Sequence, residues 1–151
     1  LIPMLEVIGP RIIGTWKLVS WTYTDELGNT VPYLGEGAQG ILMYDQQGYM
    51  NAQLMRAGRA PFAKPGFADG TAEETWLAFN SYLAYYGRYY ESQPGEIIHE
   101  VEGSLFPNWV GHREVRYATV IGDQLTLHTL PIAVQERKIV FYITWQRVKP
   151  S

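Results

Sequence analysis

The chain has 151 residues and a mass of 17.2 kDa, which predicts a single domain (residues 1–151) with a sizeable buried core. Its net charge of −3 and its lack of a basic cluster argue against nucleic acid and anionic membrane surfaces as partners. The absence of cysteine excludes disulfides and thiolate metal sites and fits a reducing compartment. Because no apolar run is long enough to span a membrane either, we expect a cytoplasmic protein.

The first third of the chain reads as short strands joined by turns. Side-chain character alternates around Gly14-Thr15-Trp16, and two turns, at residues 25–29 and 46–48, interrupt the later alternation. A glycine-rich loop at residues 35–40 lacks the Lys-Ser/Thr of a phosphate-binding loop. The strands predicted here cover residues 12–24, 30–33, 41–45 and 49–55.

The middle of the chain contains a long loop and the one convincing helix. Glycine and proline punctuate residues 56–70, and loops of this length are often lids or binding loops. Thr71-Ala-Glu-Glu74 is a capping box, which marks a helix start. We expect the helix to pack an aromatic face outside the sheet or across one end of it. That face recurs at helical spacing through Ala72, Trp76, Phe79, Leu83 and Tyr86.

The last part of the chain again predicts hairpins. Because sequential hairpins with tight turns favour closure over an open sheet, we predict an all-β, closed, up-and-down antiparallel barrel of about 8–10 strands, with one helix inserted between strands. The strands predicted here are Arg88–Ser92 with Glu96–Gly103, Arg113–Ile121 with Gln124–Leu130, and the closing strand Lys138–Val148.

Five segments carry a family resemblance: Gly14-Thr-Trp16, Gly48-Tyr-Met-Asn-Ala-Gln-Leu-Met55, Tyr85-Tyr-Gly-Arg-Tyr89, Ser104-Leu-Phe-Pro-Asn-Trp-Val-Gly111 and Trp145-Gln-Arg147. Together they resemble the lipocalin-like domain family, small and often intracellular proteins with a calycin-type barrel. The resemblance covers roughly residues 10–149. It implies a closed barrel with an internal cavity for a small apolar or aromatic molecule, and some calycin-like barrels are cofactor-free cyclases or isomerases.

The same resemblance gives Trp16 and Arg147 structural roles. In lipocalin-type barrels the early tryptophan closes one end and an arginine of the last strand lies over its ring. Such a contact is worth about 0.5–2 kcal/mol, depending on how far it is desolvated.

The sequence contains no motif for metal binding, for nucleophilic catalysis or for binding a dinucleotide. The three histidines lie on separate predicted elements without an i, i+4 pair, so we expect no metal site. There is no Gly-x-Ser-x-Gly elbow, which argues against a nucleophilic serine. There is also no glycine-rich turn between a strand and a helix to hold a dinucleotide, so we expect no cofactor.

The strand through His99 offers the best candidate for acid–base chemistry. His99 alternates with Glu100 and Glu102, and we place His99 inside because two carboxylates in an apolar interior are costly to ionise. A bulge near Gly103 would reverse this choice. An inward His99 is either a hydrogen-bonded core residue or a proton shuttle near neutral pH.

Neighbouring residues could complete a site around His99. Arg116 and Thr129 alternate with apolar residues and can face inward, and Arg116 could hold an anionic group. A mostly apolar pocket with a few convergent polar groups is typical of a ligand site. The predicted catalytic set is His99, Arg116 and Tyr89, and the predicted ligand-binding set is Tyr49, Gln53, Tyr86, Trp109 and Thr129.

Some of these assignments have plain alternatives. Tyr49 and Gln53 could lie on a solvated face, and Trp109 could fix the corner after Pro107 without covering a ligand.

Taken together, these features predict a barrel that binds a small hydrophobic, aromatic metabolite bearing a carboxylate or carbonyl. Among possible functions, we predict cofactor-free cyclisation or isomerisation of this metabolite first. A non-catalytic carrier is the second hypothesis, and a structural or interaction module is the third.

Overall fold

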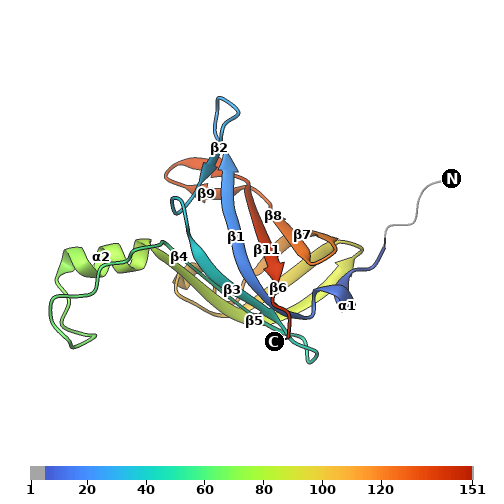
Figure 1. The fold of residues 1–151 in the computed structure, drawn as a ribbon, viewed down its shortest axis with the longest axis horizontal. Coiled ribbons are helices and arrows are strands. Elements are labelled where there is room, and N and C mark those ends of the chain that lie inside the picture. The colour runs from blue at the N-terminus through green and yellow to red at the C-terminus, as the bar shows by residue number, and fades with distance from the viewer. Residues whose placement is uncertain (1–5, 151) are drawn as a thin grey trace.

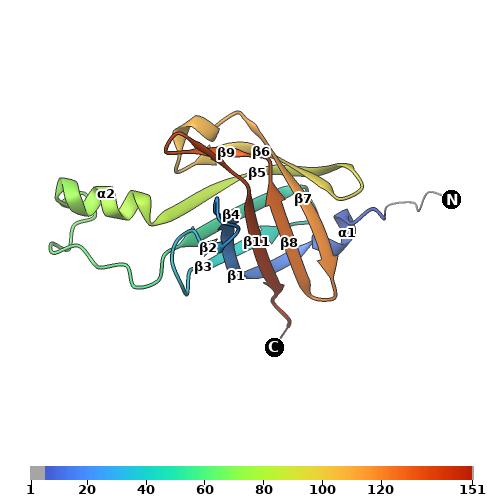
Figure 2. The same cartoon turned by 90° about the horizontal axis from the view of Figure 1, so that it is seen from above.

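The computed structural model, which describes residues 6–150, is a closed antiparallel barrel (Figures 1 and 2). Each barrel strand pairs with the next along the chain, and the last strand pairs back onto the first, so no long edge is left open. The predicted closed up-and-down barrel is therefore confirmed. Its strands within the described range are β1 (Gly14–Thr24), β3 (Gln39–Tyr44), β4 (Tyr49–Met55), β5 (Tyr82–Gln93), β6 (Glu96–Ser104), β7 (Arg113–Ile121), β8 (Gln124–Thr129) and β11 (Phe141–Arg147).

Three short strands lie beside the barrel wall. The strand β2 (Thr30–Pro32) extends the sheet next to β1, whereas β9 (Ile132–Val134) and β10 (Arg137–Ile139) form a separate small hairpin. The single closing strand predicted over residues 138–148 is therefore wrong. Residues 137–139 pair with β9 across a turn at Gln135 and Glu136, which both have positive φ, and the closing strand begins only at Phe141.

The helix α2 (Ala72–Asn80) begins at the predicted capping box but ends earlier than its apolar spacing suggests. Thr71 accepts a hydrogen bond from the Glu74 backbone, and the Glu74 side chain accepts one from the Thr71 backbone. The chain rejoins the sheet at Ser81, whose carbonyl accepts a hydrogen bond from the N–H of Arg56, the residue after β4. The residues that follow Ser81 form β5, which pairs with β4. Leu83 and Tyr86 are therefore strand residues because the sheet ladder overrides their helical spacing.

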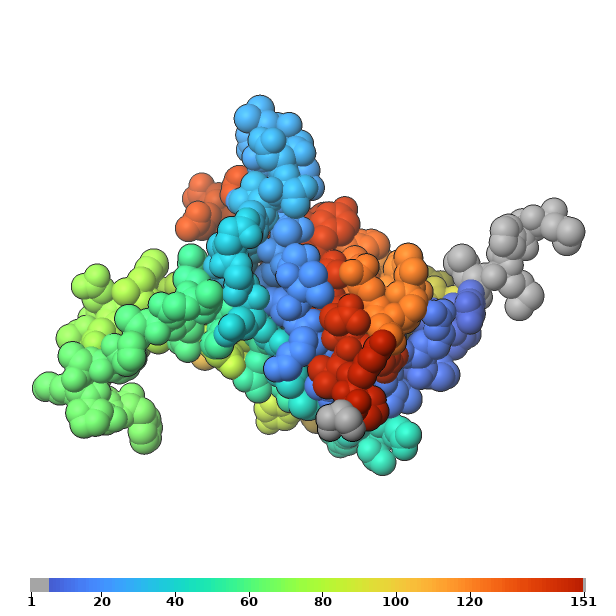
Figure 3. Space-filling model, viewed as in Figure 1, coloured from blue at the N-terminus to red at the C-terminus, as the bar shows by residue number. Residues whose placement is uncertain are grey.

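The expected packing of α2 against the barrel is also wrong. Residues 56–81, which we call the arm, stand away from the barrel in Figures 1 and 3, and none of the α2 residues is buried. Trp76 is 64% exposed. Only the C-terminal end of the helix reaches the barrel, where Phe79 and Asn80 lie beside a cavity inside the barrel.

A bulge in β1 changes which side chains face the interior. Leu18 pairs with Trp145 but Ser20 pairs with Thr144, so Val19 is an extra residue and the alternation shifts by one. Trp16 faces inward before the bulge, and Trp21 faces inward after it. Strict alternation would have turned Trp21 out to solvent.

A second bulge lies between β5 and β6. Tyr86 pairs with Gly103 whereas Gly87 pairs with Val101, which leaves Glu102 as the extra residue. His99 lies before this bulge and remains on the inner face, where it is buried. The backbone of β6 approaches Gly87 very closely at this point, because a Cβ added at Gly87 would lie only 1.9 Å from the carbonyl oxygen of Glu100.

We expect Gly87→Ala to lower the free energy of unfolding by about 1–3 kcal/mol, because the added methyl group must push the two strands apart at the bulge. Urea denaturation followed by circular dichroism measures the change. Gly122→Asn is the matched control, because Gly122 has φ +59° with open space around its Cβ position, and asparagine tolerates this conformation. An alanine at position 87 as harmless as this control would contradict the close approach.

One end of the barrel is plugged by the N-terminal segment. The short helix α1 (Gly9–Ile12) inserts Ile12, which is fully buried, and Glu91 of β5 accepts hydrogen bonds from the backbone N–H groups of Ile8 and Gly9. Trp16 lies beside this plug and donates its indole N–H to the Ile12 carbonyl at 2.9 Å. We call this the closed end of the barrel.

Arg147 of β11 completes the closed end. It pairs with Trp16 in the β1–β11 register, and its guanidinium carbon lies 4.3 Å from the centre of the Trp16 ring. The same guanidinium donates to the carbonyl oxygens of Ile13 and Arg11. The arginine therefore ties the last strand to the segment that enters the first one.

Candidate ligand cavity

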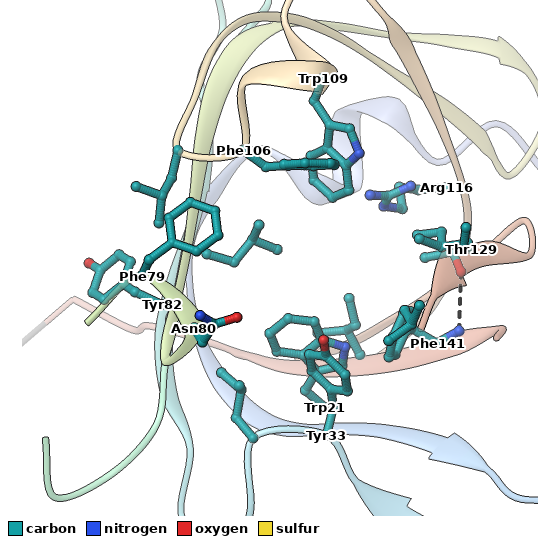
Figure 4. Close-up of a pocket in the computed structure, with 17 residues that line it drawn as sticks. Trp21, Tyr33, Phe79, Asn80, Tyr82, Phe106, Trp109, Arg116, Thr129 and Phe141 are labelled. Carbon is teal, nitrogen blue, oxygen red and sulfur yellow. Dashed lines mark hydrogen bonds between the residues drawn. The ribbon is translucent and has the colours of Figure 1, made fainter. Parts of the chain in front are cut away.

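A cavity of about 240 Å³ occupies the other half of the barrel interior, beside the arm (Figure 4). Its walls are mostly aromatic and aliphatic, with few polar groups, which is the usual make-up of a small-molecule site. The volume is smaller than the range typical of sites for drug-sized ligands, so it favours a compact ligand. The lining residues are Trp21, Tyr33, Leu34, Phe79, Asn80, Tyr82, Leu83, Leu105, Phe106, Trp109, Arg116, Thr129, Ile132, Ala133, Val134, Phe141 and Ile143.

One wall is an aromatic cluster from three separate segments. The rings of Trp21 and Tyr33 have centroids 4.8 Å apart, and Phe141 lies 4.9 Å from Tyr33 and 5.6 Å from Trp21. The tilted and edge-on arrangements of these rings are favourable beyond simple burial. Burial also raises the pKa of the Tyr33 hydroxyl, so this group is a neutral phenol. The cluster offers flat apolar surface to a ring in the cavity.

The facing wall is built by the corner between β6 and β7. This corner contains the 3₁₀ turn η1 (Pro107–Trp109), where the proline interrupts the ladder as the sequence predicts. Trp109 packs edge-on against Tyr85 at 5.3 Å and against Phe106 at 6.0 Å. It therefore fixes the corner and lines the cavity at the same time, so the two alternatives weighed for this residue are not exclusive.

Two predicted polar residues, Arg116 and Thr129, do reach the cavity. They are register partners on β7 and β8, and both are almost fully buried. The Arg116 guanidinium lies 5.9 Å from the Trp109 ring centre, and its Nη1 is 3.7 Å from a carboxylate oxygen of Glu114. Figure 4 shows Arg116 and Thr129 on the side of the cavity opposite Asn80 and Tyr82.

His99 faces the interior but is not among the residues that line the cavity. The hydroxyl of Tyr44 lies 2.7 Å from its Nε2 and the hydroxyl of Tyr85 lies 2.9 Å from its Nδ1. Burial, reinforced by the positive charge of Arg116, holds the pKa of His99 well below its ordinary value, so the imidazole is neutral. One of its nitrogens therefore donates and the other accepts a hydrogen bond.

The Tyr44–His99–Tyr85 group fills the interior beneath the cavity. Burial raises the pKa of both tyrosine hydroxyls, that of Tyr44 well above its ordinary value. Tyr89, the third predicted catalytic residue, packs edge-on against Tyr44 at 4.6 Å and donates its hydroxyl to the Asp45 carbonyl at the closed end. Neither His99 nor Tyr89 is among the residues that line the cavity.

Three residues predicted to bind the ligand lie on the outside of the barrel, which corrects their assignment. Tyr49 is exposed with the Arg88 guanidinium over its ring, and Tyr86 is exposed and covers Gly103. Gln53 accepts a hydrogen bond from the Tyr82 hydroxyl on the outer surface of β4. Their strands present the alternate residues to the interior, so the inward face is one position away from the one we chose.

Several cavity residues were missed by the sequence reasoning. Trp21 reaches the interior only because of the Val19 bulge, which alternation does not reveal. Ile132 lies between the strands predicted over residues 124–130 and 138–148, and Phe141 lies within the second of these without having been placed at a cavity. Phe79 was assigned to a helix face packed on the barrel. The density of aromatic residues at 21–33 and 141–145 is the one signal that could have indicated them.

Clusters of metal-binding side chains and helices that could span a membrane are both absent from the described residues. Within residues 6–150, no three histidine, aspartate or glutamate side chains gather closely enough to hold a metal ion. The described part of the chain also contains no helix with the length and apolar character needed to cross a membrane.

Comparison with known proteins agrees with this geometry. Residues 13–148 match the lipocalin-like domain family. The chain is also 36% identical over 107 residues to the 4′-hydroxy-3′-methoxypropiophenone carrier protein of Aspergillus oryzae, an alignment that covers 66% of this chain and 96% of that protein. Because the family match spans nearly all of the barrel, this chain belongs to the lipocalin-like domain family.

Proposed function

We propose that this protein is a non-catalytic carrier for a small aromatic molecule, held in the cavity between the Trp21 cluster and the Trp109 corner. The supporting observation is the cavity itself, a compact and mostly apolar space with two aromatic walls inside a closed barrel. The similar Aspergillus protein is named as a carrier of a single-ring aryl ketone, and such a ligand suits a cavity of this size.

The cyclase or isomerase function stays a prediction, and the site geometry favours carriage over it. A general acid or base must come within hydrogen-bond reach of the proton that it transfers. Both nitrogens of His99 are instead occupied by tyrosine hydroxyls, in a layer beneath the cavity. The cytoplasmic location also stays a prediction.

The proposed function is tested by titrating 4′-hydroxy-3′-methoxypropiophenone into the protein in a calorimeter. We expect one molecule to bind per chain, and the variant Ile132→Trp to weaken binding at least about tenfold, because Ile132 lines the cavity and packs toward the core, so that an indole at this position fills the space. Glu26→Trp, in the exposed turn after β1, is the matched control and should bind as the wild type does.

The incubated ligand should be recovered unchanged when it is analysed by mass spectrometry and chromatography. A new product would support turnover and contradict pure carriage. Binding that Ile132→Trp leaves intact would contradict the cavity as the site.

A further inference from the structure

The polar groups inside the cavity are hydrogen-bond donors gathered at one place. Arg116 on β7 and Thr129 on β8 lie directly opposite each other, a relationship that places Cβ atoms about 4.5–5.5 Å apart. Both side chains line the cavity, with exposed fractions of 4% and 3%. A single ligand atom between them can therefore meet both groups.

Both residues retain donors for a ligand. The Arg116 guanidinium has five N–H groups, and its Nη1 donates to the Val115 carbonyl at 3.1 Å, which leaves further N–H groups unused by that bond. The Thr129 Oγ1 accepts from the Phe141 backbone N–H at 3.1 Å, so its own hydroxyl proton remains free to donate. The pair thus offers donors to an acceptor in the cavity.

The charge around Arg116 favours a neutral acceptor over an anion. The Glu114 carboxylate lies 3.7 Å from Arg116 Nη1, and both side chains are largely withdrawn from solvent. Arg116 therefore already has a negative counter-charge. A carboxylate on the ligand would add a second negative charge to a poorly solvated site with one cation, which is costly.

We infer that Arg116 and Thr129 recognise a neutral carbonyl oxygen on the ligand, so that the cavity selects aryl ketones over both their deoxygenated analogues and aryl carboxylates. This inference rests on the proposed carrier function and deepens it. The ring of such a ketone would lie between the two aromatic walls, and a polar substituent at its far end would face Asn80 across the cavity (Figure 4).

The test compares three ligands of nearly the same shape by calorimetry: 4′-hydroxy-3′-methoxypropiophenone, 4-propylguaiacol, which lacks the carbonyl, and vanillate, which carries a carboxylate. We expect the ketone to bind the wild-type protein at least about tenfold more tightly than either of the other two, because a hydrogen bond from a charged donor is lost or a charge is buried. Arg116→Met should reduce the ketone preference over 4-propylguaiacol to about twofold or less.

Arg88→Met is the matched control, because Arg88 lies on the outer face over Tyr49. It should leave the affinities for all three ligands unchanged. Infrared spectroscopy adds a direct readout, since donation to the carbonyl lowers its stretching frequency on binding. This shift should be largest in the wild type and smaller in Arg116→Met, where only Thr129 still donates, and the wild-type spectra decide the matter even if that variant does not fold.

The possible failures are distinguishable. If neither the ketone nor 4-propylguaiacol binds, the proposed carrier function is wrong. If both bind equally and the carbonyl frequency does not shift, the cavity binds aromatic molecules but the donor pair is wrong. If vanillate binds most tightly, Arg116 recognises an anion and the inferred ligand class is wrong.

Discussion

Trp16→Ala is expected to lower the free energy of unfolding by about 3–5 kcal/mol, as for other large aromatic side chains removed from a core. Trp16 is completely buried, donates to the Ile12 carbonyl, and carries the Arg147 guanidinium over its ring. Its removal opens a cavity where α1, β1 and β11 meet. Because domains of this kind are stable by about 5–15 kcal/mol, much of the total would be lost.

Urea denaturation with matched m-values measures the Trp16→Ala effect. Trp76→Ala, on the exposed face of α2, is the control and should change stability by less than about 0.5 kcal/mol. Equal effects of the two substitutions would show that the closed end does not depend on Trp16.

The stability of the folded protein should fall as the pH drops below about 6.5, because of His99. The imidazole is fully buried between Tyr44 and Tyr85, and burial, together with the Arg116 charge, places its folded-state pKa well below the ordinary value. Between these two pKa values the unfolded chain binds a proton that the folded chain does not. The free energy of unfolding therefore decreases with falling pH, by up to about 1.4 kcal/mol per pH unit from this residue.

Denaturation curves recorded at intervals between about pH 7.5 and pH 5 measure this slope, which the ordinary pKa of histidine places in that range. His99→Gln should remove the histidine contribution, because glutamine can still donate to one tyrosine and accept from the other but does not titrate. His128→Gln is the control, on the outer face of β8 between the rings of Tyr117 and Tyr142, and should keep the slope. A wild-type slope that survives in His99→Gln would contradict this assignment.

The barrel itself was predictable because its hairpins leave local signals. The turns after β1 and between β7 and β8 contain glycine beside aspartate or asparagine, and the apolar alternation of β7 and β8 is unbroken, so Arg113–Ile121 was predicted with its observed bounds. The inward position of Arg116, Thr129 and His99 followed from the same alternation.

The rest of the site was not predictable, because it depends on departures from alternation and on long-range packing. The extra residue Val19 decides that Trp21 lines the cavity, and no local pattern marks it. Tyr44 and Tyr85 engage both nitrogens of His99 from two other strands, so their contact depends on the closed barrel. The helical spacing of Leu83 and Tyr86 misled because β-ladder pairing with β4 determines their conformation.

The arm has a consequence for how the cavity of such a barrel can vary. Met55 and Tyr82 are direct neighbours in the β4–β5 ladder, so residues 56–81 are an insertion into what is otherwise a hairpin. The wall of the barrel closes without this insertion, yet its last residues, Phe79 and Asn80, stand at the cavity. Exchanging or shortening the insertion can therefore reshape this side of the cavity while leaving the pairing of the barrel strands intact.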